Sequence, residues 1–378
     1  MIKFAVLGAG NGGQAFAAIL SRKGFDVKLW NRTPTTIEYI NRRGGIEIQG
    51  IDSGFAKLSL ASSNIGTVLY DADIIMVCVP ASAHRAIAEA SAPYLQDDQV
   101  VILNPGRTFG AFEFLQTIRE QGCFADIIIA ETQSLIYVCR ALRPGLVKVV
   151  GIKRALPVAA VPHYKTSKVV NILKQLHQEF TPAKSVLHTS MENMGAIFHP
   201  TPLIFNAARA EDPKVTYDHY LDGITPTIGC FLEKMDKERY DVADALDINT
   251  ITAKNWLKKV YGSHGDTLCE VFQNTKNYQR IGAPNSLKHR YIFEDIPTGL
   301  VPIASLGRML GVETPCINSF VNFSNCLLNV NFWEMGRTVE SLGINDFTKK
   351  EIYMYAFSGT TPVKMYDQEM GELMVSES

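Results

Sequence analysis

The fold of this chain is decided by the stretch Phe4-Ala5-Val6-Leu7-Gly8-Ala9-Gly10-Asn11-Gly12-Gly13-Gln14-Ala15. Its first residues are apolar and predict a buried strand, and the Ala-rich residues from Gln14 onward predict a packed helix. Between them, Gly8, Gly10 and Gly13 stand in G-x-G-x-x-G spacing. The first glycine permits a tight turn, the second lets a pyrophosphate approach the backbone, and the third lets helix and strand pack closely. The stretch therefore predicts a dinucleotide site, with phosphates at the free N–H groups of the helix start.

The residues after the second predicted strand, Asp26–Trp30, bear on the choice of cofactor. NAD-selective dehydrogenases usually carry a carboxylate here, which accepts a hydrogen bond from the ribose 2′-hydroxyl. This chain has Asn31-Arg32-Thr33, so no carboxylate repels a 2′-phosphate. Arg32 can bind that phosphate and cover the adenine, and Asn31 and Thr33 can donate to it. The same residues can also form a turn that caps the next helix. We favour NADP(H) and keep NAD(H) open, because one arginine does not exclude NAD.

Strands and helices alternate through the first half of the chain, which predicts a parallel sheet. The carboxyl ends of such strands form the ligand edge, so Val79 and Pro80 are predicted to line the cofactor. Glu131 and Thr132 follow a later strand and are predicted substrate contacts. Glu131 can meet a basic substrate group or be a buried, paired carboxylate, and both interpretations stay open. Two short strands near residues 46–49 and 56–61 predict a hairpin inserted in the sheet.

The pattern changes to helices near residue 182. Residues 1–182 therefore predict an α/β Rossmann domain with a doubly wound parallel sheet, and residues 183–378 predict an all-α domain. In the second domain, an apolar segment carries His199 before Pro200, and prolines must break its helix. We expect residues 317–334 to form a helix that is either core or the subunit contact of a homodimer. The polar tail, residues 371–378, is expected to fray.

The composition excludes several classes of function. The 378 residues are 46% hydrophobic and 20% charged, and the net charge of −1 gives no electrostatic case for nucleic acid or an anionic membrane. No apolar run is long enough to span a bilayer, and no signal peptide precedes the first strand. Seven scattered cysteines without a C-x-x-C pair argue against a disulfide framework or a structural zinc site. We expect a cytoplasmic protein with small-molecule ligands and no metal.

Three polar residues of the helical half are candidates for chemistry: His199, Arg290 and Asp295. Each has an ordinary structural interpretation. A lone histidine in an apolar segment is commonly a core residue, Asp295 is a good helix cap before Pro297, and Arg290 fits a surface position. The pattern alone leaves both interpretations open for each residue.

Several stretches, in order along the chain, resemble the opine dehydrogenase family, which includes octopine and nopaline dehydrogenases. The first is generic and the last two are fairly specific, above all the histidine-proline and the glutamate-aspartate-x-proline. They are Gly8-Ala9-Gly10-Asn11-Gly12-Gly13; Glu131-Thr132 with Tyr137-Val138-Cys139-Arg140; Asn193-Met194-Gly195 with His199-Pro200 and Asn206; and Arg290-Tyr291 with Glu294-Asp295-Ile296-Pro297 and Gly299-Leu300-Val301-Pro302.

This resemblance implies a reaction and its residues. An amino acid condenses with an α-keto acid such as pyruvate, and NAD(P)H reduces the imine to a secondary-amine dicarboxylate. His199 would be the acid–base group, Asp295 would hold it, and Arg290 would bind a carboxylate or position the nicotinamide end. Asn206, from the same motif as His199, is a further substrate candidate. Because a carboxylate on the second imidazole nitrogen fixes the tautomer, we expect His199 and Asp295 within hydrogen-bond reach.

Two alternatives compete with this interpretation. Glycerol-3-phosphate dehydrogenase and ketopantoate reductase share the two-domain plan, but they resemble this chain in the first domain only. Both families use a lysine of the helical domain near the catalytic centre, whereas this chain has none between Lys184 and Lys214. A cofactor-binding regulator without turnover would not require His199, Arg290 and Asp295. The opine dehydrogenase interpretation is therefore favoured.

Overall fold

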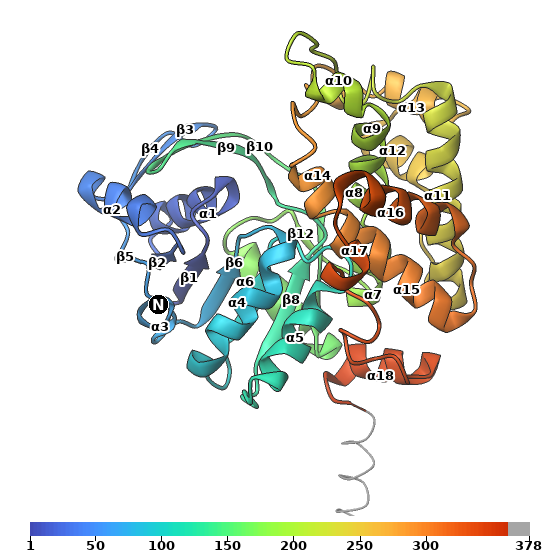
Figure 1. Ribbon diagram of the computed structural model, residues 1–378. Helices are drawn as coiled ribbons and strands as arrows, with labels where there is room; N and C mark the ends of the chain where they lie inside the picture. Colours follow the sequence, from blue (N-terminus) through green and yellow to red (C-terminus); the bar gives the residue numbers. More distant parts are fainter. Residues whose placement is uncertain (362–378) are drawn as a thin grey trace, which may run out of the picture. The chain divides into compact units, whose positions relative to one another are not determined.

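The computed structural model describes residues 1–361, so the expected frayed tail, residues 371–378, lies outside the described residues. The chain divides into two compact units (Figure 1). Among the described residues, the first contains Met1–Thr189 and residues 346–361, and the second contains Ser190–Asn345. This division falls later than the boundary expected at residues 182 and 183, and helix α18 (Lys349–Ser358) groups with the first unit.

An eight-stranded sheet forms the centre of the first unit, with the order β12-β11-β8-β7-β6-β1-β2-β5. All neighbours from β5 to β8 pair in parallel, which confirms the predicted doubly wound Rossmann sheet. The sheet as a whole is mixed, because β11 runs antiparallel to β8. The strands are β1 (Lys3–Leu7), β2 (Asp26–Trp30), β5 (Leu60–Ser62), β6 (Ile74–Val77), β7 (Val100–Leu103), β8 (Ile128–Thr132), β11 (Leu156–Val161) and β12 (Phe180–Pro182).

Helices follow these strands as the alternating pattern predicts. Helix α1 starts directly after the glycine turn, and its apolar residues Ala15 to Leu20 are almost wholly buried. Helices α4 and α5 pack against each other. The helices of this unit are α1 (Asn11–Arg22), α2 (Pro34–Arg43), α3 (Ile65–Leu69), α4 (His84–Ser91), α5 (Gly110–Glu120), α6 (Thr166–Lys174) and α18.

A second, four-stranded sheet of the first unit was not predicted. Its order is β4-β3-β10-β9, and it packs on α1 (Figure 1). The strands β3 (Ile46–Gly50) and β4 (Gly54–Ala56) form a hairpin, but β3 pairs with β10 (Leu146–Ile152), which pairs with β9 (Tyr137–Arg143). The prediction of a hairpin inserted in the main sheet is therefore wrong. An apolar pattern shows which residues are buried but not which distant strand supplies the hydrogen bonds.

The second unit is helical in its described residues, apart from an isolated bridge between Asp218 and Gly282. The expected break in the apolar segment is confirmed, because Pro200 begins a new helix. The helix expected over residues 317–334 is interrupted instead, since Asn329 adopts a left-handed φ of 51° that ends α16. The helices are α7 (Val186–Met191), which crosses the unit boundary, α8 (Gly195–Phe198), α9 (Pro200–Phe205), α10 (Ala207–Glu211), α11 (Pro226–Ala245), α12 (Ala253–Tyr261), α13 (Leu268–Gln273), α14 (Arg290–Phe293), α15 (Val301–Leu310), α16 (Pro315–Leu328) and α17 (Phe332–Met335).

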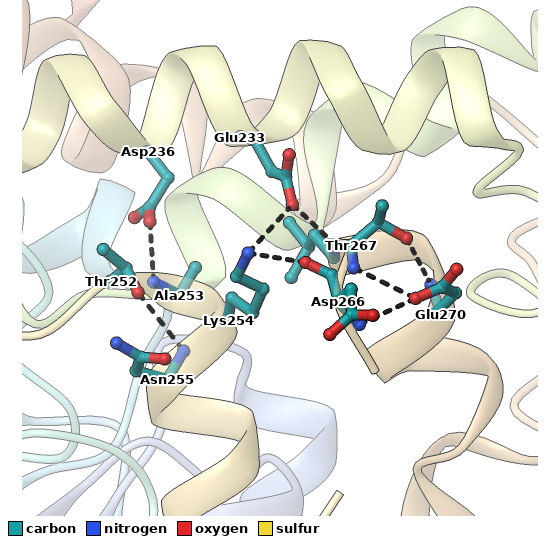
Figure 2. A network of polar contacts seen from close by, with 10 residues as sticks. Glu233, Asp236, Thr252, Ala253, Lys254, Asn255, Asp266, Thr267 and Glu270 are labelled. Atoms are coloured by element: carbon teal, nitrogen blue, oxygen red, sulfur yellow. Dashed lines mark hydrogen bonds and ion pairs between the residues drawn. The ribbon is translucent and has the colours of Figure 1, made fainter. Parts of the chain in front are cut away.

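Carboxylates of the long helix α11 hold the starts of two neighbouring helices (Figure 2). Asp236 accepts a hydrogen bond from the backbone N–H of Ala253, the first residue of α12, at 2.6 Å. Glu233 accepts from Leu268, the first residue of α13, at 2.7 Å. Negative charge is favourable at a helix N-terminus, so these contacts fix α12 and α13 on α11. Among residues 1–361, no helix has the length and apolar character needed to cross a membrane.

Candidate active site

The glycine turn between β1 and α1 has the geometry that a pyrophosphate requires. Gly8 has a left-handed φ of 107°, and a Cβ on Gly13 would lie 1.6 Å from the Gly8 carbonyl oxygen. Gly10 caps α1, and no described residue comes within 4 Å of the place where its Cβ would stand. The predicted cofactor residues Val79 and Pro80 follow β6, and a Cβ on Gly8 would lie 2.8 Å from Val79 Cγ1. These residues fit a dinucleotide whose phosphates face the start of α1.

Asn11 and Gly12 belong to the stretch predicted to bind the dinucleotide. They contact strand β9 of the second sheet and the segment before it. The side-chain oxygen of Asn11 accepts a hydrogen bond from the backbone N–H of Ala141 at 2.8 Å. The backbone carbonyl oxygen of Asn11 accepts one from the Cys139 thiol at 3.3 Å. A Cβ on Gly12 would lie 2.9 Å from Leu135 Cδ1. Burial raises the pKa of Cys139 to about 11, so this thiol packs rather than reacts. The first turn of α1 is thus held by β9 and by Leu135 in the segment before it.

The predicted 2′-phosphate residues lie directly after β2. The Asn31 side-chain oxygen accepts from the Ala9 N–H at 3.1 Å, which ties this loop to the glycine turn. Thr33 is the N-cap residue of α2, with Pro34 next to it, as the turn interpretation expected. Arg32 is exposed, and within residues 1–361 its guanidinium makes no hydrogen bond or ion pair. Its donors therefore remain available for an anionic ligand.

Glu131 and Thr132, predicted substrate contacts, are buried at the end of β8. The Glu131 carboxylate accepts from the Ala111 N–H in the first turn of α5 at 2.9 Å, and from the Thr189 hydroxyl. The Thr132 hydroxyl donates to the carbonyl of Ser134 at 2.9 Å. These contacts favour the interpretation of Glu131 as a buried, paired carboxylate, because the free N–H groups at the start of a helix satisfy a carboxylate placed there. A substrate role for either residue stays a prediction.

His199 and Asp295 meet in the second unit. The distance from His199 Nδ1 to Asp295 Oδ2 is 2.8 Å, which confirms the expected hydrogen-bond reach between residues far apart in the sequence. Asp295 is fully buried, and the His199 side chain is 17% exposed. A carboxylate at Nδ1 selects the tautomer that leaves Nε2 for proton transfer. The pair can therefore act as an oriented acid–base group.

His199 occupies the break between α8 and α9, because Pro200 cannot continue the first helix. The break turns the backbone at the residue whose side chain meets Asp295. Asn206, predicted to contact substrate, ends α9. Its amide donates to the carbonyls of Pro202 at 2.8 Å and Gly223 at 3.0 Å. Those bonds hold the end of α9, and a substrate role for Asn206 stays a prediction.

Asp295 is presented by a π-helical turn over Ile296–Leu300. The Leu300 N–H donates to the Asp295 carbonyl at 3.2 Å, the i to i+5 bond of a π-helix. Such single turns occur frequently at functional sites. Pro297 lies within the turn and Asp295 is its N-cap residue, but the Asp295 side chain makes no capping hydrogen bond and meets the imidazole of His199 instead.

Arg290 lies on α14, one turn before Asp295. Its guanidinium is 55% exposed and its Nη1 lies 3.4 Å from Oε2 of the buried Glu294. The guanidinium carbon lies 5.5 Å from the centre of the Tyr291 ring. A guanidinium has five N–H donors, so this loose contact leaves it able to take a carboxylate.

Aromatic and histidine side chains around His199 were not predicted from the sequence. The Tyr291 ring stacks on the His199 imidazole with 4.3 Å between centroids and 12° between planes. The rings of His219 and His289 lie 4.9 Å and 4.6 Å from Tyr291. Burial, followed by the nearby His199, lowers the pKa of His219 to about 3, so it is neutral near pH 7. The motif contains Tyr291 next to Arg290, which was the only sequence feature that pointed to this ring. The stack itself could not be predicted, because His199 lies far from Tyr291 in the sequence.

Two family models match the chain. Residues 182–328 match the model described as NAD/NADP octopine/nopaline dehydrogenase, alpha-helical domain. Residues 3–121 match the N-terminus of NAD-dependent glycerol-3-phosphate dehydrogenase. An opine dehydrogenase of Arthrobacter sp. (strain 1C) is 40% identical over 346 residues, which are 91% of this chain and 96% of the relative.

Solved structures show the same fold. Octopine dehydrogenase with NADH and L-arginine has a TM-score of 0.81 and 21% identity, covering 96% of this chain and 99% of the other. Yersinopine dehydrogenase with NADP+ has a TM-score of 0.72 and 15% identity, covering 92% and 96%. A nucleotide-binding sheet joined to a helical domain is therefore the fold of this chain as well.

Proposed function

The chain belongs to the opine dehydrogenase family, and on this premise we propose that His199 is its acid–base group and Asp295 the residue that orients it. The protein is an NAD(P)-dependent oxidoreductase acting on the CH–NH group of donors. It condenses an amino acid with an α-keto acid reductively and catalyses the reverse oxidation. The 2.8 Å contact between His199 and Asp295 is the observation that supports the residue assignment.

The proton balance explains why one imidazole suffices. The substrate ammonium gives a proton to His199 Nε2, and its nitrogen then bonds to the keto carbon. The carbonyl oxygen leaves as water with the two remaining nitrogen protons, which gives the imine. Bound NAD(P)H supplies the hydride for the imine carbon, and His199 returns its proton to the nitrogen. The proton taken first is the proton given last, so the imidazole ends as it began.

Asp295 and Arg290 have distinct proposed roles. The buried Asp295 carboxylate stabilises the imidazolium that His199 becomes after the first step. Arg290 binds a substrate carboxylate with two parallel N–H donors, which holds the imine in a defined orientation. Its exposed guanidinium and its loose contact to Glu294 support this role.

We propose NADP(H) as the preferred cofactor, with NAD(H) also accepted. The exposed Arg32, the absence of a carboxylate at residues 31–33 and the open glycine turn support the proposal. Residues Gly8, Gly10 and Gly13 would hold the pyrophosphate through backbone N–H groups. Arg32, with Asn31 and Thr33, would take the 2′-phosphate.

We propose pyruvate as a candidate keto acid, supported by octopine dehydrogenase having been solved with NADH and pyruvate. A cytoplasmic location is consistent with seven free cysteines. A homodimer is supported by the exposed Phe323 and Leu327 on α16. A polyol-phosphate dehydrogenase has less support, since the match to the glycerol-3-phosphate dehydrogenase model ends at residue 121.

A substrate screen tests this function. Purified protein is mixed with NADPH, pyruvate or 2-oxoglutarate, and each common amino acid, and NADPH oxidation is followed by absorbance. We expect oxidation that requires both substrates and yields a secondary amine detectable by mass spectrometry. His199→Gln should lose this activity while still binding NADPH. Full turnover by that variant would refute the acid–base assignment, and no oxidation with any pair would count against the enzyme proposal.

A further inference from the structure

A ring stack restrains His199 in a direction that Asp295 does not. The hydrogen bond at Nδ1 fixes one ring atom, but the imidazole can still tilt about that bond. Tyr291 lies parallel to the imidazole, with 4.3 Å between the ring centroids, and blocks such tilting on its side. We infer that Tyr291 is a positioning residue that holds the imidazole of His199 in its working orientation. The inference rests on the proposed acid–base role of His199.

Tyr291 is itself held in place. Its backbone N–H donates to Nδ1 of His289, the residue that caps α14, at 3.3 Å. The His289 ring meets the Tyr291 ring nearly edge-on, at 87° and 4.6 Å. Burial and the nearby Tyr291 raise the pKa of the Tyr220 hydroxyl, so the side chain of Tyr291 lies next to the buried Tyr220. A ring restrained through its backbone and at its edge can serve as a fixed surface for a neighbouring side chain.

One short stretch supplies both restraints on the imidazole. Tyr291 on α14 gives the stack, and Asp295 before the π-helical turn gives the hydrogen bond. Ile292 and Ile296 of the same stretch are fully buried and anchor it in the core of the second unit. Tyr291 and Asp295 are therefore fixed relative to each other, so the stack and the hydrogen bond act on the imidazole from constant positions.

The electrostatics of the stack suit a base that becomes a cation. The face of an aromatic ring is negative, so it attracts an imidazolium more than a neutral imidazole. On another side of Tyr291, His219 is buried and neutral near pH 7, because burial lowers its pKa to about 3. His219 therefore adds ring surface without adding positive charge. Tyr291 thus supports His199 in the form it takes during turnover.

Steady-state kinetics test this inference with three variants. Tyr291→Leu removes the ring, Tyr291→Phe keeps the ring and removes the hydroxyl, and Phe231→Leu removes a ring that contacts Phe205 and Phe320 in the same unit. With NADPH, pyruvate and a mixture of common amino acids, we expect Tyr291→Leu to lower kcat about 10- to 100-fold. The KM for pyruvate should change little. Tyr291→Phe should restore kcat to within about threefold, and Phe231→Leu should match the wild type.

The outcomes separate this inference from the proposed function. Unchanged kcat in Tyr291→Leu, together with loss of activity in His199→Gln, would overturn the stacking role and leave the function intact. Full activity in His199→Gln would instead remove the function on which the inference rests. A kcat equally low in Tyr291→Phe would also overturn the inference, because the ring is retained there.

Nuclear magnetic resonance provides a second test that does not depend on the folding of Tyr291→Leu. In histidine-labelled wild-type protein, the His199 ring protons should lie upfield, because they face the Tyr291 ring; His199→Gln assigns their signal. The upfield position should persist in Tyr291→Phe. Ordinary shifts for these protons in the wild type would overturn the stack.

Discussion

Gly299 lies against Ala196, and their contact sets how closely the π-helical turn approaches α8. A Cβ on Gly299 would lie 2.6 Å from the Cβ of Ala196, too close for two carbon atoms. Asp295 precedes this turn and His199 follows α8, so the glycine governs the separation of the proposed acid–base pair. Gly299 thus permits the close approach of the two elements that carry the proposed acid–base pair.

Gly299→Ala should therefore lower kcat about 10- to 100-fold, because it pushes Asp295 away from the imidazole. Overpacking should also cost about 1–3 kcal/mol in the free energy of unfolding. Gly282→Ala is the matched control, since no described residue lies within 4 Å of a Cβ built there. Kinetics and urea unfolding measure both effects. Wild-type kcat in Gly299→Ala would contradict the packing argument.

Asp295→Asn should reduce kcat by about 10²- to 10⁴-fold with little change in the binding of NADPH. The amide preserves the shape of the side chain but can donate to Nδ1, which favours the wrong imidazole tautomer. Asp241→Asn, at a half-exposed aspartate of α11, serves as the control. Steady-state rates and NADPH fluorescence titration provide the comparison. A kcat within a factor of two of the wild type would show that Asp295 does not orient His199.

Arg32→Ala should raise the KM for NADPH by about 10- to 100-fold, because it removes a charge-assisted contact worth about 1.5–3 kcal/mol. The KM for NADH should stay nearly constant, since NADH has no 2′-phosphate. Arg42→Ala removes another exposed arginine from the neighbouring helix α2 and should leave both values unchanged. An equal effect on both cofactors would argue against a 2′-phosphate site at Arg32.

His219 should make the protein sensitive to acid. The pKa of His219 is lowered to about 3 in the folded protein from an ordinary value of 6.5. The unfolded chain therefore binds the proton first, and stability is retained above pH 6.5 and lost as the pH falls toward 3. At pH 5, the contribution of His219 lowers the free energy of unfolding by about 2 kcal/mol relative to its value above pH 6.5.

His219→Phe should remove this part of the acid sensitivity, which urea unfolding at pH 7.5 and pH 5 can measure. Its free energy of unfolding should fall less between the two pH values than that of the wild type. His264→Gln, at an exposed histidine of the same unit, should behave like the wild type. The same pH dependence in His219→Phe and wild type would refute the assignment.

Local patterns predicted the features that depend on neighbouring residues. Gly8, Gly10 and Gly13 act within one turn, so their spacing predicted the tight turn at Gly8 and the close approach at Gly13 that the structure has. The break at His199 was predictable because Pro200 removes a backbone donor. The second sheet was missed because the strands from β4 to β9 lie between β3 and β10 in the sequence, and the residue pattern does not encode pairing over that distance. The sequence predicted no role for Tyr291, because its contact with His199 exists only in the fold.

In the proposed cofactor site, the start of α1 is attached to β9 and to the segment before it, whereas the residues proposed to bind the 2′-phosphate follow β2. The proposed pyrophosphate end would be shaped by the glycines together with Leu135, Cys139 and Ala141, whereas the proposed adenosine end would depend on the loop after β2. In this proposed site, exchange of Arg32 and Thr33 should change the nucleotide preference, whereas Asn31 must be kept because its side chain binds the Ala9 N–H of the glycine turn. Conversely, substitutions along β9 would tune how firmly any dinucleotide is held, whichever one the loop selects.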